Sequence, residues 1–206
     1  MKILSVGAEA VVYSEAGRIA KQRQPKKYRI KELDDRLRLH RMRREMKVME
    51  ALQQLGVPVP KIIDADEKIA TITMQLIDGK KVRDILNGSN YGTIAADIGK
   101  SIGTMHSNNI VHGDLTTSNM ISDMGGKIHF IDFGFGLFSD KDEDKAVDLH
   151  LFRQALDSSH HKIAAAAFEV AIKSYKEANK SGWKEVLKRL EKVDARGRNK
   201  GKGLRG

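Results

Sequence analysis

Short runs that alternate apolar and polar residues fill the first third of the chain, and this alternation is typical of β-strands with one buried face. The runs that we predict as strands are 2–6, 11–14 and 18–21, then 61–64 and 69–77. Between the two groups, apolar residues recur at three- and four-residue steps, at Leu39, Met42, Met46, Met49 and Leu52. This spacing predicts a long amphipathic helix over residues 37–55.

Both ends of the long helix carry their own signals. Asp34 and Asp35 suit its start, because a carboxylate there can cap free backbone N–H groups and is favoured by the helix dipole. Gly56 suits its end, and Pro58 and Pro60 follow it. Proline has no backbone N–H and cannot continue a helix. We therefore predict a helix that starts at the two aspartates and ends before the glycine.

The remainder of the chain is mostly helical in pattern. In the predicted helix 91–108, one apolar stripe holds Ile94, Ile98, Ile102 and Met105. Further helices are predicted over 143–158, 162–179 and 183–192, and a hairpin pairs 120–122 with 127–131. From residue 195 the chain consists mainly of glycine and basic residues without an apolar pattern, which predicts a flexible basic tail over 195–206.

Composition adds a preference for acidic partners. The chain has 206 residues, of which 40% are apolar, and a formal net charge of +10. That length allows one large domain or two small lobes that share a cleft. The basic charge favours a polyanion such as nucleic acid or a nucleotide, although a basic surface also keeps proteins in solution. Cysteine is absent, which excludes disulfides and thiolate metal sites. Without a signal-peptide or membrane-span pattern, we predict a cytoplasmic protein with no membrane contact.

Two motifs carry the chemistry. His112 to Asn119 reads H-G-D-L-T-T-S-N, and Ile131 to Gly134 reads I-D-F-G. An aspartate and an asparagine five residues apart on a tight loop can face one cleft, and a second aspartate follows a strand. Phosphoryl transfer needs such a set, with a carboxylate near the attacking oxygen and oxygen ligands for Mg²⁺. The alternative is that these polar residues only stabilise a loop and a strand end.

These motifs resemble those of the protein-kinase-like superfamily, and the resemblance extends from about Val6 to Ser158. It implies an α+β, two-lobed fold. The N-terminal lobe, residues 1–77, would hold a small antiparallel sheet and the long helix. The C-terminal lobe, residues 78–194, would be mainly helical. It lacks room for an activation segment, because few residues separate D-F-G from the helix at 143 and no A-P-E follows.

The resemblance assigns roles to matching positions. Asp114 would be the catalytic base, and Asn119 and Asp132 would bind Mg²⁺. Lys21 would hold the α- and β-phosphates of ATP, and Glu45 would pair with Lys21. The remaining positions that would contact ATP are Gly7 and Val12 in the phosphate-covering loop and Met74, Gln75, Leu76 and Ile77 in the hinge.

Several of these assignments have plain alternatives. Lys21 could be one more solvated lysine of the basic connector that follows it. Glu45 could form a surface pair with Arg41, four residues earlier on the same helix. Asp148 resembles the helix aspartate that braces the catalytic loop, and it could equally be an ordinary surface residue of a helix.

A closer resemblance covers nearly the whole length. The pieces G-A-E-A-V-V-Y, K-Q-R-Q-P-K-K-Y-R-I-K-E-L-D, H-G-D-L-T-T-S-N-M, I-D-F-G-F-G and R-G-R-N-K-G-K resemble the small atypical kinase/ATPase subunit family of the KEOPS complex, the p53-related protein kinase family, which is RIO-like. This resemblance implies an atypical serine kinase or ATPase that uses ATP with Mg²⁺, or Mn²⁺, and supports threonylcarbamoyladenosine formation on tRNA. It also implies two partners, a transferase subunit with a sugar-kinase-like fold and a small accessory subunit.

The distribution of basic residues favours a tRNA partner without reference to the family resemblance. Bases outnumber acids from Lys21 to Arg44, and the tail carries Arg196, Arg198, Lys200, Lys202 and Arg205 without an acid. Such segments can neutralise backbone phosphates, although a basic tail is often only a solubilising element. Three other functions remain open: a stand-alone serine/threonine protein kinase, a small-molecule phosphotransferase, and a non-catalytic docking subunit.

Overall fold

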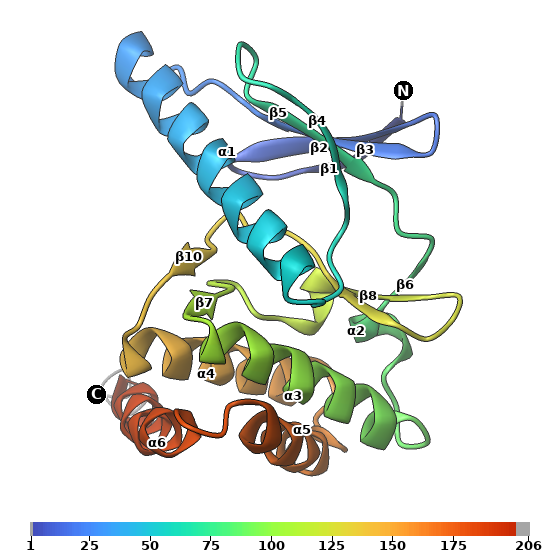
Figure 1. The fold of residues 1–206 in the computed structure, drawn as a ribbon, viewed down its shortest axis with the longest axis vertical. Coiled ribbons are helices and arrows are strands. Elements are labelled where there is room, and N and C mark those ends of the chain that lie inside the picture. Colours follow the sequence, from blue (N-terminus) through green and yellow to red (C-terminus); the bar gives the residue numbers. More distant parts are fainter. Residues whose placement is uncertain (1, 201–206) are drawn as a thin grey trace, which may run out of the picture.

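The computed structural model describes the backbone of residues 2–200 and the side chains of residues 2–196. Figure 1 shows a sheet with one long oblique helix above a group of helices. The upper part comprises β1 (Lys2–Val6), β2 (Ala10–Glu15), β3 (Arg18–Arg23), α1 (Lys31–Gln54), β4 (Ile62–Asp66) and β5 (Thr71–Gln75). The strands form one antiparallel sheet in the order β1-β2-β3-β5-β4. The predicted α+β, two-lobed fold with its five N-terminal strands and long helix is confirmed.

The lower part is mainly helical. It comprises β6 (Gly79–Lys81), α2 (Val82–Ile85), α3 (Tyr91–Ser107), β7 (Ile110–Val111), a 3-10 helix (Thr117–Asn119), β8 (Met120–Asp123), β9 (Ile128–Phe130), β10 (Leu137–Phe138), α4 (Asp142–Ser159), α5 (Ala164–Ala178) and α6 (Trp183–Lys200). The sequence prediction missed β6, α2, β7 and β10, which are only two to four residues long. Elements this short have too few positions for a period to show.

The start of α1 differs from the prediction. The helix begins at Lys31, and its N-cap residue Ile30 makes no side-chain cap. Asp34 is buried and accepts hydrogen bonds from the backbone N–H of Lys26, from Arg29 and from Arg38 Nε, the last at 2.9 Å. The predicted capping role of the two aspartates is therefore wrong. Asp34 instead fastens the basic connector to the first turns of the helix.

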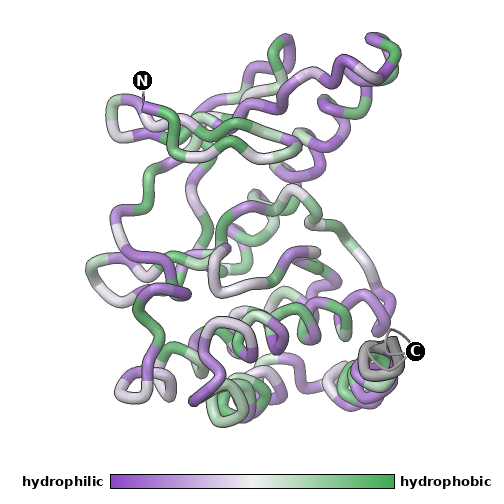
Figure 2. Tube along the Cα trace, turned by 180° about the vertical axis from the view of Figure 1, so that it is seen from behind, coloured by the Kyte–Doolittle hydropathy of each residue, from purple (hydrophilic) through white to green (hydrophobic). Residues whose placement is uncertain are grey.

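The core joins both lobes. Purple, hydrophilic segments predominate along α1 in Figure 2, and the helix buries one apolar side with Met42, Val48 and Leu52 at 0% exposure. In the lower lobe, α3 and α5 pack at glycine positions. A Cβ atom added at Gly99 would lie 2.0 Å from the carbonyl oxygen of Ala171, so only glycine allows this approach. These contacts pack α3 against α5, and the helices of the lower lobe support the site.

The C-terminal helix continues beyond its predicted end. α6 runs to Lys200, beyond the predicted end at residue 192 and into the predicted tail, and residues 201–206 lie outside the described part of the chain. Ala195, Arg196, Arg198 and Lys200 are good helix formers and favour the continuation, whereas Gly197 and Asn199 are not. The helix is also tied to α4, because Arg189 and Arg196 both pair with Glu143, at 2.9 and 2.7 Å.

The segment that follows Asp132 is as short as predicted. Residues 134–141 lead directly to α4, and on the way Leu137 pairs with Val111 in a two-stranded β7–β10 sheet. The C-terminal lobe therefore has no activation segment. Among residues 2–200, no helix is both long and apolar enough to cross a membrane.

Candidate active site

Four charged side chains meet between the sheet and α1. Lys21 Nζ on β3 lies 2.5 Å from Glu45 Oε1 on α1 and 2.7 Å from Asp132 Oδ1 after β9. Arg23 Nη2 lies 2.5 Å from the other carboxylate oxygen of Glu45. The Glu45 side chain is 1% exposed, and that of Asp132 is 51% exposed. The arrangement thus joins three separate segments through one lysine, which is buried and is not a solvated residue of the connector.

The ionisation of this cluster follows from its pairing. Burial by itself lowers the pKa of Lys21, but the carboxylates of Glu45 and Asp132 outweigh burial and raise the pKa above its usual value. Burial would raise the pKa of Asp132, and the nearby Lys21 ammonium lowers it below the ordinary value instead. Lys21 and Asp132 are therefore both charged at neutral pH.

Asp114 and Asn119 form the second part of the site. Asn119 Nδ2 donates to the carboxylate of Asp114 at 2.8 Å and to its backbone carbonyl at 2.9 Å. The backbone N–H of Ile131 donates to the carbonyl of Asn119 at 2.9 Å. This bond connects the H-G-D loop to the strand end that carries Asp132. The two motifs therefore lie together, as their spacing predicted.

His112 fixes the loop from below. Its Nε2 atom lies 3.2 Å from the carbonyl of Ile131, and Asp114 N–H donates to its Nδ1 atom. One ring nitrogen donates and the other accepts, so the imidazole is neutral. Burial lowers the pKa of His112, which agrees with that state. The ring also packs against buried Phe133, with the two centroids 4.6 Å apart.

Asp148 on α4 braces the same loop. It is 1% exposed and accepts hydrogen bonds from the backbone N–H groups of His112 at 2.6 Å and Gly113 at 2.8 Å. The interpretation as a brace is therefore confirmed, and that as a surface residue is wrong. Asp148 Oδ2, which accepts from His112 N–H, also lies 3.4 Å from Nε2 of His106, and Nδ1 of that ring lies 3.1 Å from the hydroxyl of Tyr175 on α5. A buried polar chain thus links the loop to the helical base.

Two backbone positions explain local residue choices. Gly113 has φ of +80°, and a Cβ atom there would lie 2.5 Å from the carbonyl oxygen of Phe135. The catalytic loop and the segment after D-F-G pack so closely that no side chain fits, which accounts for H-G-D. Asp132 has φ of +63°, a left-handed conformation that aspartate and asparagine tolerate better than most residues.

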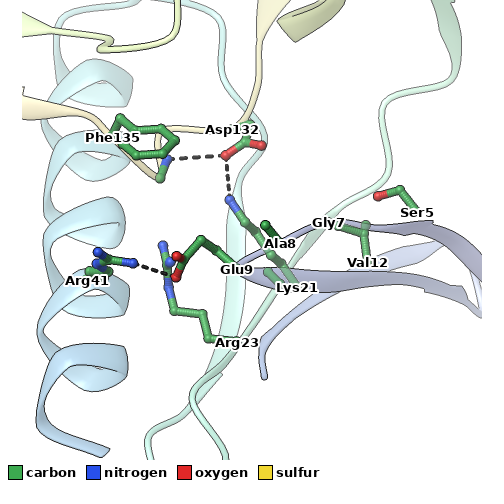
Figure 3. Close-up of a pocket in the computed structure, with 12 residues that line it drawn as sticks. Ser5, Gly7, Ala8, Glu9, Val12, Lys21, Arg23, Arg41, Asp132 and Phe135 are labelled. Carbon is green, nitrogen blue, oxygen red and sulfur yellow. Dashed lines mark hydrogen bonds and ion pairs between the residues drawn. The ribbon is translucent and has the colours of Figure 1, made fainter. Parts of the chain in front are cut away.

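A cavity of about 240 Å³ opens beside the charged cluster. Figure 3 shows Lys21, Asp132 and the loop after β1 around it. Of the residues predicted from the sequence, Gly7, Val12, Lys21 and Asp132 line this cavity. Glu45 does not line the cavity, but it pairs with Lys21 and Arg23, which do. Asp114 and Asn119 are connected to the strand end of Asp132 by the hydrogen bonds given above.

The four residues of the predicted hinge do not line this cavity. Met74 and Gln75 end β5, and Leu76 and Ile77 lead towards β6, outside the lining of the cavity. Met74 and Ile77 are each 8% exposed. Of the tail residues that we predict to contact tRNA, only Arg196 has a described side chain, and it does not line the cavity. Arg196 pairs with Glu143, the side chains of Arg198 and Lys200 lie outside the described residues, and so does Lys202.

Oxygen donors for a metal are few but suitable. Residues 2–196 contain no group of three or more histidine, aspartate or glutamate side chains that could hold a metal. Mg²⁺ in phosphate-binding sites commonly uses one or two protein oxygens together with phosphate oxygens and water. Asp132 offers a half-exposed carboxylate. Asn119 uses its amide nitrogen on Asp114, which leaves the amide oxygen for a cation. This donor set fits Mg²⁺ brought in by a phosphate ligand.

Sequence reasoning missed three charged residues of the site. Arg23 shares Glu45 with Lys21, and Arg41 and Glu9 both line the cavity and pair at 2.5 Å. The sequence held signals for the two arginines. Arg23 stands two residues after Lys21, and alternate residues of a strand share a face. Arg41 stands four residues before Glu45, on the same side of a helix.

Comparisons with known proteins agree with this geometry. Residues 7–149 match the RIO domain family. The chain is 36% identical over 212 residues to the KEOPS complex subunit Bud32 of Pyrococcus abyssi, covering 96% of each chain. It is 34% identical to a probable bifunctional tRNA threonylcarbamoyladenosine biosynthesis protein of Methanobrevibacter smithii, with 95% of this chain matching 36% of that protein.

The fold has solved relatives. The crystal structure of the Rio2 kinase–ADP/Mg²⁺–phosphoaspartate complex from Chaetomium thermophilum matches with a TM-score of 0.64 at 17% identity, covering 97% of this chain and 72% of that chain. This match concerns the fold. Together with the RIO-domain match and the full-length similarity to Bud32, it identifies the chain as a member of the RIO-domain family, within the family of KEOPS complex subunit Bud32.

Proposed function

We propose that this chain is a Mg-ATP-dependent atypical serine kinase or ATPase that works as a subunit of a KEOPS-like complex in threonylcarbamoyladenosine modification of tRNA. The observation that carries the proposal is the convergence of Lys21, Glu45 and Asp132 in one ion cluster beside the Asp114–Asn119 pair. The relatives named for KEOPS and for tRNA threonylcarbamoyladenosine biosynthesis support the biological setting.

The chain's own residues would divide the work in phosphoryl transfer. Lys21, held by buried Glu45, would place its ammonium on the nucleotide phosphates once Asp132 exchanges it for a metal. Asp114, oriented by Asn119, would accept the proton of the attacking hydroxyl or water. Bound Mg²⁺ would neutralise charge on the phosphates, with Asp132 and Asn119 as its protein ligands. Little other chemistry is needed, because this reaction depends mainly on position and charge.

The nucleotide itself would lie along the cavity. Gly7 and Val12 belong to the loop and strand that line it, and would cover the phosphates and part of the base. Met74, Gln75, Leu76 and Ile77 would meet the adenine from the end of β5, through backbone groups. Mn²⁺ could replace Mg²⁺, since both prefer oxygen ligands.

The partners follow from the relatives. This chain matches only 36% of a bifunctional relative, so the rest of that relative is a second part that is fused to a region similar to this chain. We propose that a separate subunit corresponds to this second part, and that it is the transferase subunit with a sugar-kinase-like fold. A small accessory subunit would complete the assembly. tRNA would be attracted by the net charge of +10 and by Arg196, Arg198, Lys200 and Lys202, the first of which must then exchange Glu143 for phosphate.

ATP turnover tests the proposal. Purified wild type should release ADP in the presence of Mg²⁺, and release should increase when the transferase partner and tRNA are added. Asp132→Asn keeps a residue that tolerates the left-handed backbone and should lower the rate about 100-fold or more. Equal background rates for both folded proteins would rule out catalysis. Turnover that rises with aminoglycosides or choline, and not with tRNA complexes, would indicate a small-molecule phosphotransferase. Phosphate transfer to a defined peptide at the rate of ATP turnover would indicate a protein kinase.

A further inference from the structure

The loop that covers the cavity carries an acidic residue at an unexpected place. Glu9 follows Gly7 and Ala8, lines the cavity with them and is 38% exposed. ATP brings about four negative charges to such a loop, and like charges at close range repel. A carboxylate here therefore opposes the ligand, unless it has another task.

The partner of Glu9 suggests that task. Arg41 Nη1 on α1 lies 2.5 Å from Glu9 Oε2, so the pair spans the cavity mouth from loop to helix. Figure 3 shows the two side chains meeting beside Arg23 and Lys21. Arg41 stands one helical turn before Glu45, on the side of α1 that faces the Lys21 cluster. Among the contacts of the described residues, Glu9 is the only carboxylate paired with it.

We propose that Arg41 is a ligand of the terminal phosphate of the nucleotide, and that Glu9 occupies its guanidinium only until that phosphate arrives. The inference rests on the function proposed above, since it presupposes ATP in this cavity. The guanidinium of an arginine can bind a phosphate group through two hydrogen bonds. A terminal phosphate also carries about twice the negative charge of a single carboxylate. The terminal phosphate therefore displaces Glu9, and the loop separates from α1 while Arg41 turns to the ligand.

This exchange makes the loop respond to the number of phosphates. The α- and β-phosphates have Lys21 as their cation, so ADP leaves the Glu9–Arg41 pair closed. ATP opens the pair and moves Arg41 onto the group that is transferred. Arg41 thus distinguishes ATP from ADP, which neither the lysine nor the hinge can do.

The test compares a non-hydrolysable ATP analogue with ADP by isothermal titration calorimetry in the presence of Mg²⁺. Arg41→Gln should weaken the analogue about 10- to 100-fold, as expected for one charge-assisted hydrogen-bonded contact, and should change ADP affinity less than about twofold. Arg41→Lys should recover part of the loss. Glu9→Gln should tighten the analogue about two- to fivefold, because it removes the competitor of the phosphate.

A matched control lies on the same helix. Arg43 pairs with Glu67 through two hydrogen bonds of 2.7 and 2.6 Å, and neither residue lines the cavity. Arg43→Gln removes the same charge and should leave both affinities unchanged. Melting temperatures close to wild type for Arg41→Gln and Arg43→Gln exclude a folding effect.

The outcomes separate this inference from the proposed function. If wild type binds neither nucleotide, the proposed function fails and this inference falls with it. If wild type binds the analogue and Arg41→Gln binds it equally well, only the role of Arg41 is refuted. Equal losses for the analogue and ADP would also refute it, because they would place Arg41 away from the terminal phosphate.

Discussion

Glu45 should be more important for stability than the lysine that it holds. Among the described side chains it is the one carboxylate that pairs with both Lys21 and Arg23, at 2.5 Å each, and it is 1% exposed. Glu45→Ala would leave Arg23, with a side chain 5% exposed, without its anion, and would leave Lys21 with Asp132 alone. Lys21→Met is milder, because Glu45 keeps Arg23 and the half-exposed Asp132 can turn to water.

The expected magnitudes follow from this asymmetry. Removing one partner of a buried ion pair costs about 3–5 kcal/mol, because the other charge is left buried and uncompensated. Lys21→Met should cost about 0–2 kcal/mol, since every remaining charge keeps a partner or solvent. A domain with about 10 kcal/mol of stability, the middle of the usual range, stays folded at 25 °C after either change. Both variants should lose ATP turnover, so activity alone cannot separate them.

Urea unfolding followed by circular dichroism measures the difference. The free energy of unfolding should fall in the order wild type, Lys21→Met, Glu45→Ala, with the last two at least about 1 kcal/mol apart. Glu67→Ala is the control, because it breaks a fully solvated pair with Arg43 and should leave the midpoint unchanged. A Lys21→Met variant as unstable as Glu45→Ala would refute the reasoning, and so would a Glu45→Ala variant that unfolds like wild type.

Three further predictions concern the loop and the helical base. Asp148→Asn should lower ATP turnover and cost about 1–3 kcal/mol, because an amide cannot accept hydrogen bonds from two backbone N–H groups on two oxygens; unchanged kinetics would contradict the brace. Gly99→Ala should destabilise the fold by about 1–3 kcal/mol through the clash with Ala171, whereas Gly92→Ala on the same helix meets nothing within 4 Å and should be neutral or slightly stabilising. Thermal melts compare the two. The free energy of unfolding should fall from pH 7.5 to 5.5, because the unfolded chain protonates His112 below its ordinary pKa of 6.5 while the folded chain keeps it neutral. His112→Gln should reduce this fall in urea titrations at the two pH values, and an equal fall would refute the assignment.

The sequence predicted the long elements because their periods are long enough to detect. The stripe from Leu39 to Leu52 predicted α1, and the alternation along 18–21 predicted β3, which runs from Arg18 to Arg23. The predicted start of α1 was wrong because an aspartate near a helix start can bind another segment of the folded chain, and the sequence alone does not distinguish this from capping. Asp34 holds the connector through Arg29 and Arg38, and this only the folded chain reveals.

Part of the site was equally predictable. The order and distance of H-G-D and I-D-F-G placed Asp114, Asn119 and Asp132 together, since the motif spacing encodes one loop and one strand end. The pairing of Lys21 with Glu45 followed only from the resemblance, because the two residues are 24 positions apart and lie on different elements. The Glu9–Arg41 pair was not predictable, since it depends on how the loop after β1 lies against α1.

Metal-dependent ATP binding tests the central claim most directly. If Asp132 and Asn119 hold Mg²⁺ between the protein and the phosphates, calorimetry should show that wild type binds a non-hydrolysable ATP analogue at least about tenfold more tightly with Mg²⁺ than with EDTA. Asp132→Asn, folded and otherwise intact, should lose that difference. An affinity that is independent of Mg²⁺ in wild type, or a Mg²⁺ effect that survives in Asp132→Asn, would contradict the account.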